Sequence, residues 1–198
     1  RCISYIPGRL EEGYGLNPIA IRQLHGEGIS LIITVDCGIT AVEEAQLCKE
    51  LGIDLVITDH HECKETLPYA AAVVDPHRPD GGYPHKNLSG VGVAFKLAAA
   101  VSGDQDEMLR RYSDLVCLGT VADVMPMVGE NRYLVQTGLK KLTVDPRPGL
   151  AALISKAMAP GKEISASTIS FTLAPRINAA GNIGVESVAD STDLIIGD

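Results

Sequence analysis

Hydrophobic and polar positions along the first half of the chain follow two alternating patterns. Short, continuous runs rich in β-branched residues predict strands buried in a sheet. Amphipathic stretches between them predict helices. The run at residues 29–36 reads as a strand covered on both faces. The strands are expected at 2–7, 29–36, 54–59 and 70–76, and the helices at 16–28 and 40–52.

End signals support both predicted helices. Asn17 is a candidate N-cap for the first, and Pro18 occupies its first position. In the second, Thr40 and Glu43 have the spacing of a capping box, and Gly52 follows the last apolar position as a C-terminal stop.

Strands and helices that alternate at short spacing predict an α/β fold with a doubly wound, mostly parallel sheet flanked by helices. The pattern becomes largely helical after about residue 87. This divides the chain into a parallel α/β part, 1–86, and a mainly helical part, 87–198, whose segment 165–181 is expected to return to the sheet edge. Helices are expected at 91–101, 106–119, 132–142 and 148–158.

Charge and cysteine content narrow the function classes. The net charge is −8, and residues 1–130 hold 10 basic against 19 acidic side chains. This disfavours a simple sequence-independent nucleic-acid binder and suits a domain that gathers cations. Five cysteines without a C-x-x-C pair predict a reduced, cytoplasmic protein. No apolar run approaches the roughly 18–20 residues that a membrane span needs.

Acid and imidazole groups follow three predicted strands. In parallel βαβ units the carboxyl ends of the strands share one edge, where ligands bind in open α/β sheets. A buried carboxylate there costs desolvation energy unless it is paired or bound to a metal. Asp36 ends the predicted strand 29–36. Asp59, His60 and His61 stand at the end of the strand 54–59, and Asp75 and His77 stand at the end of the strand 70–76.

Asp123 stands alone in the apolar stretch LGTVADVMP and is the fourth part of this pattern. Together with Asp36 and His60 it makes a mixed oxygen and nitrogen site, which suits Mn²⁺ and, less readily, Mg²⁺. Zn²⁺ held by His60, His61 and Cys63 is an alternative, although that spacing is cramped for a structural zinc site.

These residues carry a family resemblance. TDHHE after a strand, TVDCG one βα unit earlier and GTVADVMP downstream resemble the DHH phosphoesterase superfamily. Within it, YIPGRLEEGYGLN, LSGVGVAFKLA and APRINAAG are similar to the RecJ-type single-strand-specific exonucleases. The resemblance covers nearly the whole chain, and the combined motifs are far more specific than an Asp-His-His triplet alone.

The resemblance implies 5′→3′ hydrolysis of single-stranded DNA in repair and recombination, with two Mn²⁺ (or Mg²⁺) ions. Asp36 would bridge both ions, and His60 and Asp123 would ligate one of them. His61 would act catalytically beside the scissile phosphate, and Asp59 would orient a ligand imidazole.

Substrate contacts are implied as well. Arg176 would hold a phosphate in a catalytic role, since its planar fork suits bidentate contact. The other implied substrate contacts are His77, Ser89, Gly90 and Asn178. The family resemblance also implies partners such as a helicase or a single-strand-binding protein, and no membrane.

Two departures from the family pattern affect this expectation. The family's first Asp-x-Asp motif would precede residue 1, and its DHHA1 and OB-fold domains would follow residue 198. Two divalent ions carry +4 while Asp36 and Asp123 carry −2, so we expect the isolated chain to be inactive. Asn182 also replaces an arginine usual after NAAG.

Two other functions stay open at this point. One is a phosphodiesterase of the same superfamily acting on short oligonucleotides, cyclic dinucleotides or pyrophosphate. The other is a DHH-like scaffold without catalysis.

Overall fold

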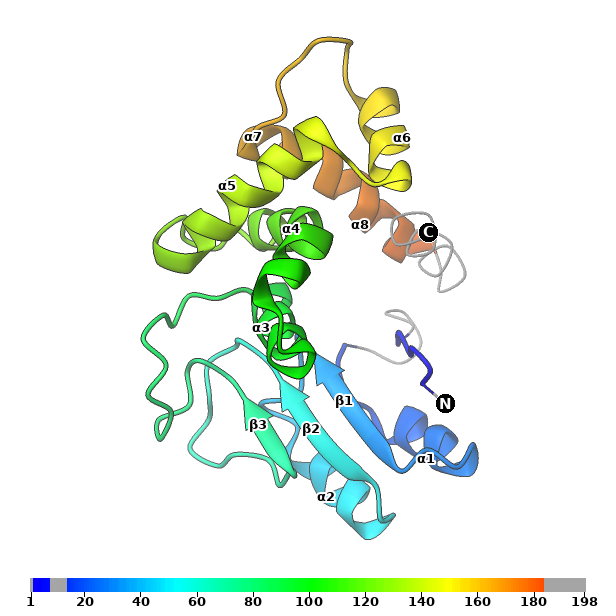
Figure 1. Ribbon diagram of the computed structural model, residues 1–198. Coiled ribbons are helices and arrows are strands. Elements are labelled where there is room, and N and C mark those ends of the chain that lie inside the picture. The colour runs from blue at the N-terminus through cyan, green and yellow to red at the C-terminus, as the bar shows by residue number, and fades with distance from the viewer. Residues whose placement is uncertain (1, 8–13, 184–198) are drawn as a thin grey trace. The chain divides into compact units, whose positions relative to one another are not determined.

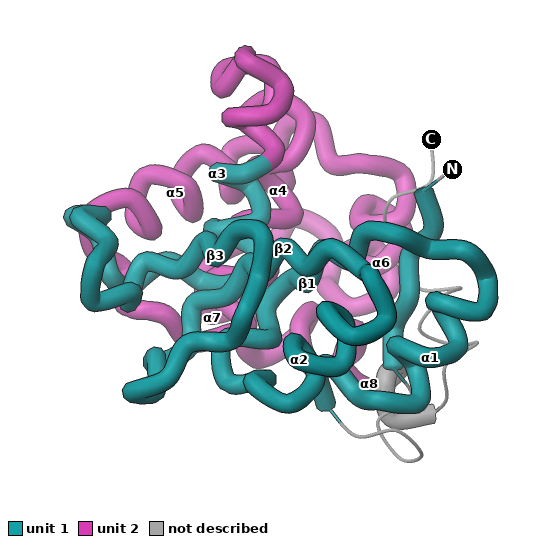
Figure 2. Tube along the Cα trace, turned by 90° about the horizontal axis from the view of Figure 1, so that it is seen from below, with its two compact units in different colours: residues 1–97 teal, residues 98–198 magenta. Residues whose placement is uncertain are grey.

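The computed structural model of the protein describes residues 2–7 and 14–183 (Figure 1). The chain forms two compact units, residues 1–97 and 98–198 (Figure 2). The first holds the described strands, and the second is helical.

Three parallel strands form the sheet of the first unit, in the order β1-β2-β3. They are β1 (Leu31–Val35), β2 (Asp54–Thr58) and β3 (Ala72–Val74). In register, Ile33 lies opposite Val56, and Ile57 lies opposite Val73. The predicted parallel α/β architecture is confirmed, and the carboxyl ends of all three strands share one edge.

The two helices between residues 14 and 54 are also where the pattern predicts them. In α1 (Pro18–Gly26), the Asn17 side chain accepts a hydrogen bond from the Ala20 N–H at 2.8 Å, as expected of an N-cap. The helix α2 (Val42–Glu50) is capped by Leu51 and followed by a left-handed Gly52, with φ 70°.

The capping box predicted for α2 is wrong. Ala41 is the N-cap and makes no side-chain capping bond. Thr40 instead belongs to a tight turn before the helix, in which the Ala41 N–H donates to the Gly38 carbonyl at 3.0 Å. The helix therefore begins later than the box requires, and Glu43 lies in its first turn.

One face of the sheet carries the core of the first unit. Ile21 of α1 and Ala45 and Cys48 of α2 pack with Leu55 and Ile57 of β2. The opposite face of β1 is open: Leu31, Ile33 and Val35 are 48%, 51% and 56% exposed. The expectation that this strand is covered on both faces is wrong for the described residues, because α1 and α2 pack on the same side.

Two other segments differ from expectation. Residues 2–7 form no strand, since neither edge of the described sheet pairs with them. Residues 165–181, expected to return to the sheet edge, are helical and add no strand to it.

The helices of the second half confirm the sequence prediction. The helices α4 (Gln105–Ala122) and α5 (Gly129–Val144) pack with α6 (Pro148–Ala157) and the π-helix η1 (Ile169–Leu173). Their shared core includes Cys117, Leu118, Val135, Leu150 and Ile169. No described helix is long and apolar enough to span a membrane. The elements are α3 (Gly90–Ser102), α4 (Gln105–Ala122), α5 (Gly129–Val144), α6 (Pro148–Ala157), α7 (Ala166–Thr168), the π-helix η1 (Ile169–Leu173) and α8 (Ala174–Ile183).

Candidate metal centre

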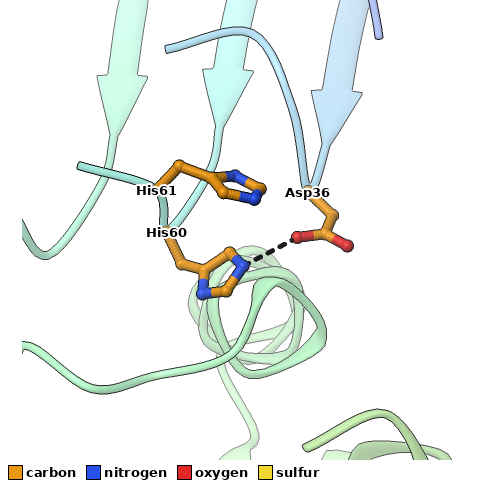
Figure 3. A group of neighbouring side chains, drawn as sticks. All are labelled: Asp36, His60 and His61. Atoms are coloured by element: carbon orange, nitrogen blue, oxygen red, sulfur yellow. Dashed lines mark ion pairs between the residues drawn. The ribbon is translucent and has the colours of Figure 1, made fainter. Parts of the chain in front are cut away.

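Two neighbouring strand ends bring one carboxylate and two imidazoles together. Asp36 directly follows β1, and His60 and His61 follow β2 after Asp59. One potential ligand atom from each of Asp36, His60 and His61 lies within 4.8 Å of the other two (Figure 3). This is the grouping that shared strand ends predict.

His60 is fixed at both ring nitrogens. Its Nδ1 lies 3.1 Å from the Leu88 carbonyl, which can only accept, so Nδ1 carries the proton. Its Nε2 then points to Asp36 Oδ1 at 3.1 Å. The residue is only 8% exposed, so this orientation is held inside the protein.

Asp59 supports the two histidines from below the surface. Its Oδ1 accepts from the His60 N–H at 2.7 Å and lies 2.6 Å from His61 Nδ1, and its Oδ2 accepts from the Ile39 N–H at 2.9 Å. Burial raises the pKa of this carboxyl, but the hydrogen bonds from Ile39, His61 and His60 outweigh burial and hold the pKa below its usual range. Asp59 is therefore an ionised support that fixes His61 Nδ1 as a donor and leaves Nε2 as an acceptor.

The backbone of Asp36 is held in an unusual conformation. Its φ of 62° lies in the left-handed region, which L-residues rarely adopt. The Asp36 N–H donates to the Thr58 carbonyl at 3.0 Å, and the Tyr14 hydroxyl donates to the Asp36 carbonyl at 2.7 Å. Strain of this kind is typical of functional sites, because the surrounding structure must enforce it.

The cluster fits a hard or borderline divalent cation. Asp36 Oδ1 is buried and accepts no hydrogen bond, while two imidazole nitrogens of acceptor character face the same region. Octahedral ions such as Mg²⁺ hold their ligands at about 2.0–2.1 Å, so adjacent ligand atoms lie about 3 Å apart. The 3.1 Å between His60 Nε2 and Asp36 Oδ1 matches that spacing.

The described residues give no support to the zinc alternative. Cys63 is not among the donors that the structure groups with His60 and His61. Burial, with the charges of Asp59 and Asp36, also raises the pKa of the neighbouring Cys37 thiol to about 11. That thiol therefore stays protonated at neutral pH while no metal is bound.

Three of the predicted substrate contacts lie in the same unit. Ser89 is buried, and its Oγ accepts from the Gly92 N–H at 3.2 Å, so it caps α3, which begins at Gly90. His77 Nε2 lies 3.5 Å from Glu62, and its Nδ1 lies 3.6 Å from the buried Asp75.

The other predicted site residues belong to the second unit. Asp123 is the C-cap of α4, and Val124 after it has φ 56°. The Val124 N–H donates to Val121 and the Met125 N–H to Thr120, which is a Schellman ending with valine where glycine is usual. Arg176 and Asn178 lie on α8 with exposed side chains, and Arg176 Nη1 donates to the Thr172 carbonyl at 2.6 Å.

Pattern reasoning missed the groups that hold the cluster in place. They are the Leu88 carbonyl, the Ile39 N–H and the Tyr14 hydroxyl. Two of these are backbone groups, which carry no residue-type signal. A hollow of about 270 Å³, lined in part by Tyr14, Asp59 and His61, lies beside the cluster.

The fold and the cluster define a class: a parallel α/β domain with a carboxylate–imidazole group at the strand ends. A family model described as the DHH family, N-terminal domain, matches residues 1–120. The chain belongs to this family, as its motifs predict.

Comparison with known proteins identifies relatives that are longer than this chain. The single-stranded-DNA-specific exonuclease RecJ of Bacillus subtilis (strain 168) is 49% identical over 180 residues, covering 90% of this chain and 22% of that protein. RecJ of Escherichia coli (strain K12) is 41% identical over 196 residues, covering 92% and 34%.

Solved structures agree with the sequence comparison. A crystal structure of exonuclease RecJ bound to manganese matches with a TM-score of 0.81 at 37% identity, covering 97% of this chain and 48% of that one. RecJ of Thermus thermophilus in complex with Mn²⁺ matches with a TM-score of 0.75 at 36% identity, covering 91% and 27%. The chain therefore spans less than half the length of each of these relatives.

Proposed function

We propose that this chain is the metal-binding catalytic part of a single-stranded-DNA-specific exonuclease that hydrolyses phosphodiester bonds. The observation that carries the proposal is the cluster of Asp36, His60 and His61, fixed by Asp59 and Leu88 at the carboxyl edge of a parallel sheet. Relatives named as RecJ exonucleases, two of them solved with manganese, support the same reading.

Each site residue has a distinct proposed role. Asp36 and His60 hold Mn²⁺ or Mg²⁺, and Asp123 is a further ligand by resemblance to the family. A pair of such ions, when bound, activates water and offsets the charge of the leaving oxygen. Asp59 stays outside the ligand set, because its own hydrogen bonds occupy both oxygens.

His61 has the freedom that a catalytic group needs. Its side chain is 49% exposed, while Asp59 fixes Nδ1 and so keeps Nε2 as an acceptor. From there it can take a proton from water, and once protonated it can donate to a phosphate oxygen. Arg176 offers a guanidinium to a phosphate, and His77, Ser89, Gly90 and Asn178 are proposed substrate contacts.

Metal binding tests the proposal directly. We expect wild-type chain to bind Mn²⁺ in a titration followed by the electron paramagnetic resonance of the free ion. H60A should weaken this binding at least tenfold, because it removes the buried nitrogen facing Asp36. H25A, which changes an exposed histidine of α1, is the matched control. Equal Mn²⁺ binding by H60A and H25A would contradict the assignment.

Substrate preference separates the two catalytic alternatives. Any Mn²⁺-dependent hydrolysis should favour long single-stranded DNA over dinucleotides, cyclic dinucleotides and pyrophosphate, and D36A should abolish it. D54A is the control, since Asp54 is exposed at the opposite end of β2. Preference for a dinucleotide or pyrophosphate would favour the other phosphodiesterase class. Helicases and single-strand-binding proteins are proposed partners by family resemblance alone.

A further inference from the structure

We propose that Gly90 is a positioning residue of the metal centre: its lack of a side chain sets where the Asp36 carboxylate lies. The inference rests on the proposed metal-binding role of Asp36 and His60. This role is separate from the substrate contact proposed for Gly90 above, because here Gly90 acts through another residue.

The contact between Gly90 and Asp36 is closer than any side chain would permit. A Cβ atom placed on Gly90 would lie 2.0 Å from Asp36 Oδ1, 2.3 Å from Cγ and 2.6 Å from Cβ. Rotating the Asp36 side chain moves the first two atoms but leaves its Cβ in place. A methyl group at residue 90 therefore requires the backbone to shift.

Neither the backbone at Asp36 nor that of the first turn of α3 can make this shift without breaking hydrogen bonds. Asp36 is tied to Thr58 and Tyr14 through its own backbone groups and has a left-handed φ. On the other side, Ser89 caps α3 through both its hydroxyl and its carbonyl, which accepts from the Val93 N–H at 2.9 Å. The ligand carboxylate and the first turn of α3 are thus packed as a fixed pair.

The same turn also fixes the second ligand. Leu88, two residues before Gly90, supplies the carbonyl that holds His60 Nδ1 at 3.1 Å. Figure 3 shows the helix beside the His60 and Asp36 side chains, and its dashed line joins His60 Nε2 and Asp36 Oδ1, which lie 3.1 Å apart. Displacing this turn would disturb Asp36 and His60 through different contacts, so Gly90 sets the spacing between them.

Mn²⁺ affinity gives the first test. G90A should bind Mn²⁺ at least tenfold more weakly than wild type, although alanine is the better helix former. G26A is the matched control, a glycine-to-alanine change in α1 where no atom lies within 4 Å of the new Cβ. It should change Mn²⁺ affinity less than twofold. Wild-type affinity in G90A would overturn the proposal.

A double-mutant cycle separates positioning from general packing. Without metal, G90A should lower the urea midpoint of unfolding when residue 36 is Asp. Replacing Asp36 by Gly, which suits φ 62°, removes all three clashing atoms. In the D36G background G90A should then shift the midpoint no more than G26A does.

An equal shift in both backgrounds, or a failure to fold in both, would overturn the proposal. If wild type binds no Mn²⁺ at all, the proposed metal function fails. The metal-free cycle still decides whether Gly90 accommodates Asp36, so the two failures are distinguishable.

Discussion

At the scale of single residues, two buried carboxylates at adjacent strand ends differ in their electrostatics. Asp59 has hydrogen bonds to both oxygens, which hold its pKa low against the effect of burial. Burial raises the pKa of Asp75, opposed only in part by the hydrogen bond from the His77 N–H. Asp75 Oδ2 is buried and has no hydrogen-bond partner in the described structure. One carboxylate therefore stabilises the fold in its ionised form, and the other destabilises it.

The difference predicts opposite pH dependences for two conservative substitutions. Because the pKa of Asp75 is raised in the folded state, ionisation of this carboxyl lowers the free energy of unfolding. This loss of stability is absent below the unfolded pKa of about 4 and grows as pH rises through the folded pKa. D75N should increase the free energy of unfolding at pH 7 by about 1–2 kcal/mol, since it removes a buried charge whose Oδ2 accepts no hydrogen bond. The increase should shrink toward pH 4, as measured by urea unfolding.

D59N is the companion measurement. Because the pKa of Asp59 is lowered in the folded state, its ionised carboxylate adds to the free energy of unfolding. This added stability is present above the unfolded pKa and is lost as pH falls through the folded pKa. D59N should therefore destabilise the protein at pH 7 and less so in acid. The same pH trend for both variants would contradict this account.

At the scale of elements, the sequence pattern predicts the strands and helix ends that depend on residues close together in the chain. The run of β-branched residues predicted β1, and Asn17 predicted the start of α1, because a strand's composition and a cap's oxygen act within a few residues. The α2 capping box failed because a turn at Gly38 delayed the start of the helix. The left-handed φ of Asp36 and the carbonyl of Leu88 could not be predicted from pattern, because both arise from contacts between segments distant in the chain.

The α4–α5 packing is another such contact, and it yields a prediction. A Cβ on Gly138 would lie 2.1 Å from the Ser113 carbonyl oxygen and 2.3 Å from Cys117 Cβ. G138A should lower the free energy of unfolding by about 2–3 kcal/mol, because separating the helices outweighs the better helix propensity of alanine. Q136A, at an exposed position of α5, should change it by less than about 0.5 kcal/mol. A neutral or stabilising G138A in urea unfolding would contradict the close packing.

At the scale of the whole molecule, net charge governs how strongly the chain binds a nucleic acid, which is a polyanion. The net charge is −8, and the acidic excess lies in residues 1–130, which include the metal cluster and α4. Nucleic-acid affinity that comes from phosphate neutralisation needs many basic contacts, each adding about 0.7 to the salt slope on single strands. Such contacts are scarce in this part of the chain. A substrate phosphate should therefore depend on bound cations for attraction.

We therefore expect the binding of single-stranded DNA to this chain to depend on divalent metal and only weakly on salt. Anisotropy of a labelled phosphorothioate oligonucleotide, chosen to resist cleavage, should show weak binding with chelator and at least a fivefold gain with Mn²⁺. The slope of log affinity against log salt should stay below about 2, which corresponds to no more than roughly three phosphate contacts. D36A should lose the Mn²⁺-dependent gain, whereas D54A, with the same change in net charge, should keep it. Tight, steeply salt-dependent binding in chelator would instead show that a basic surface of this chain, and not its metal centre, attracts the strand.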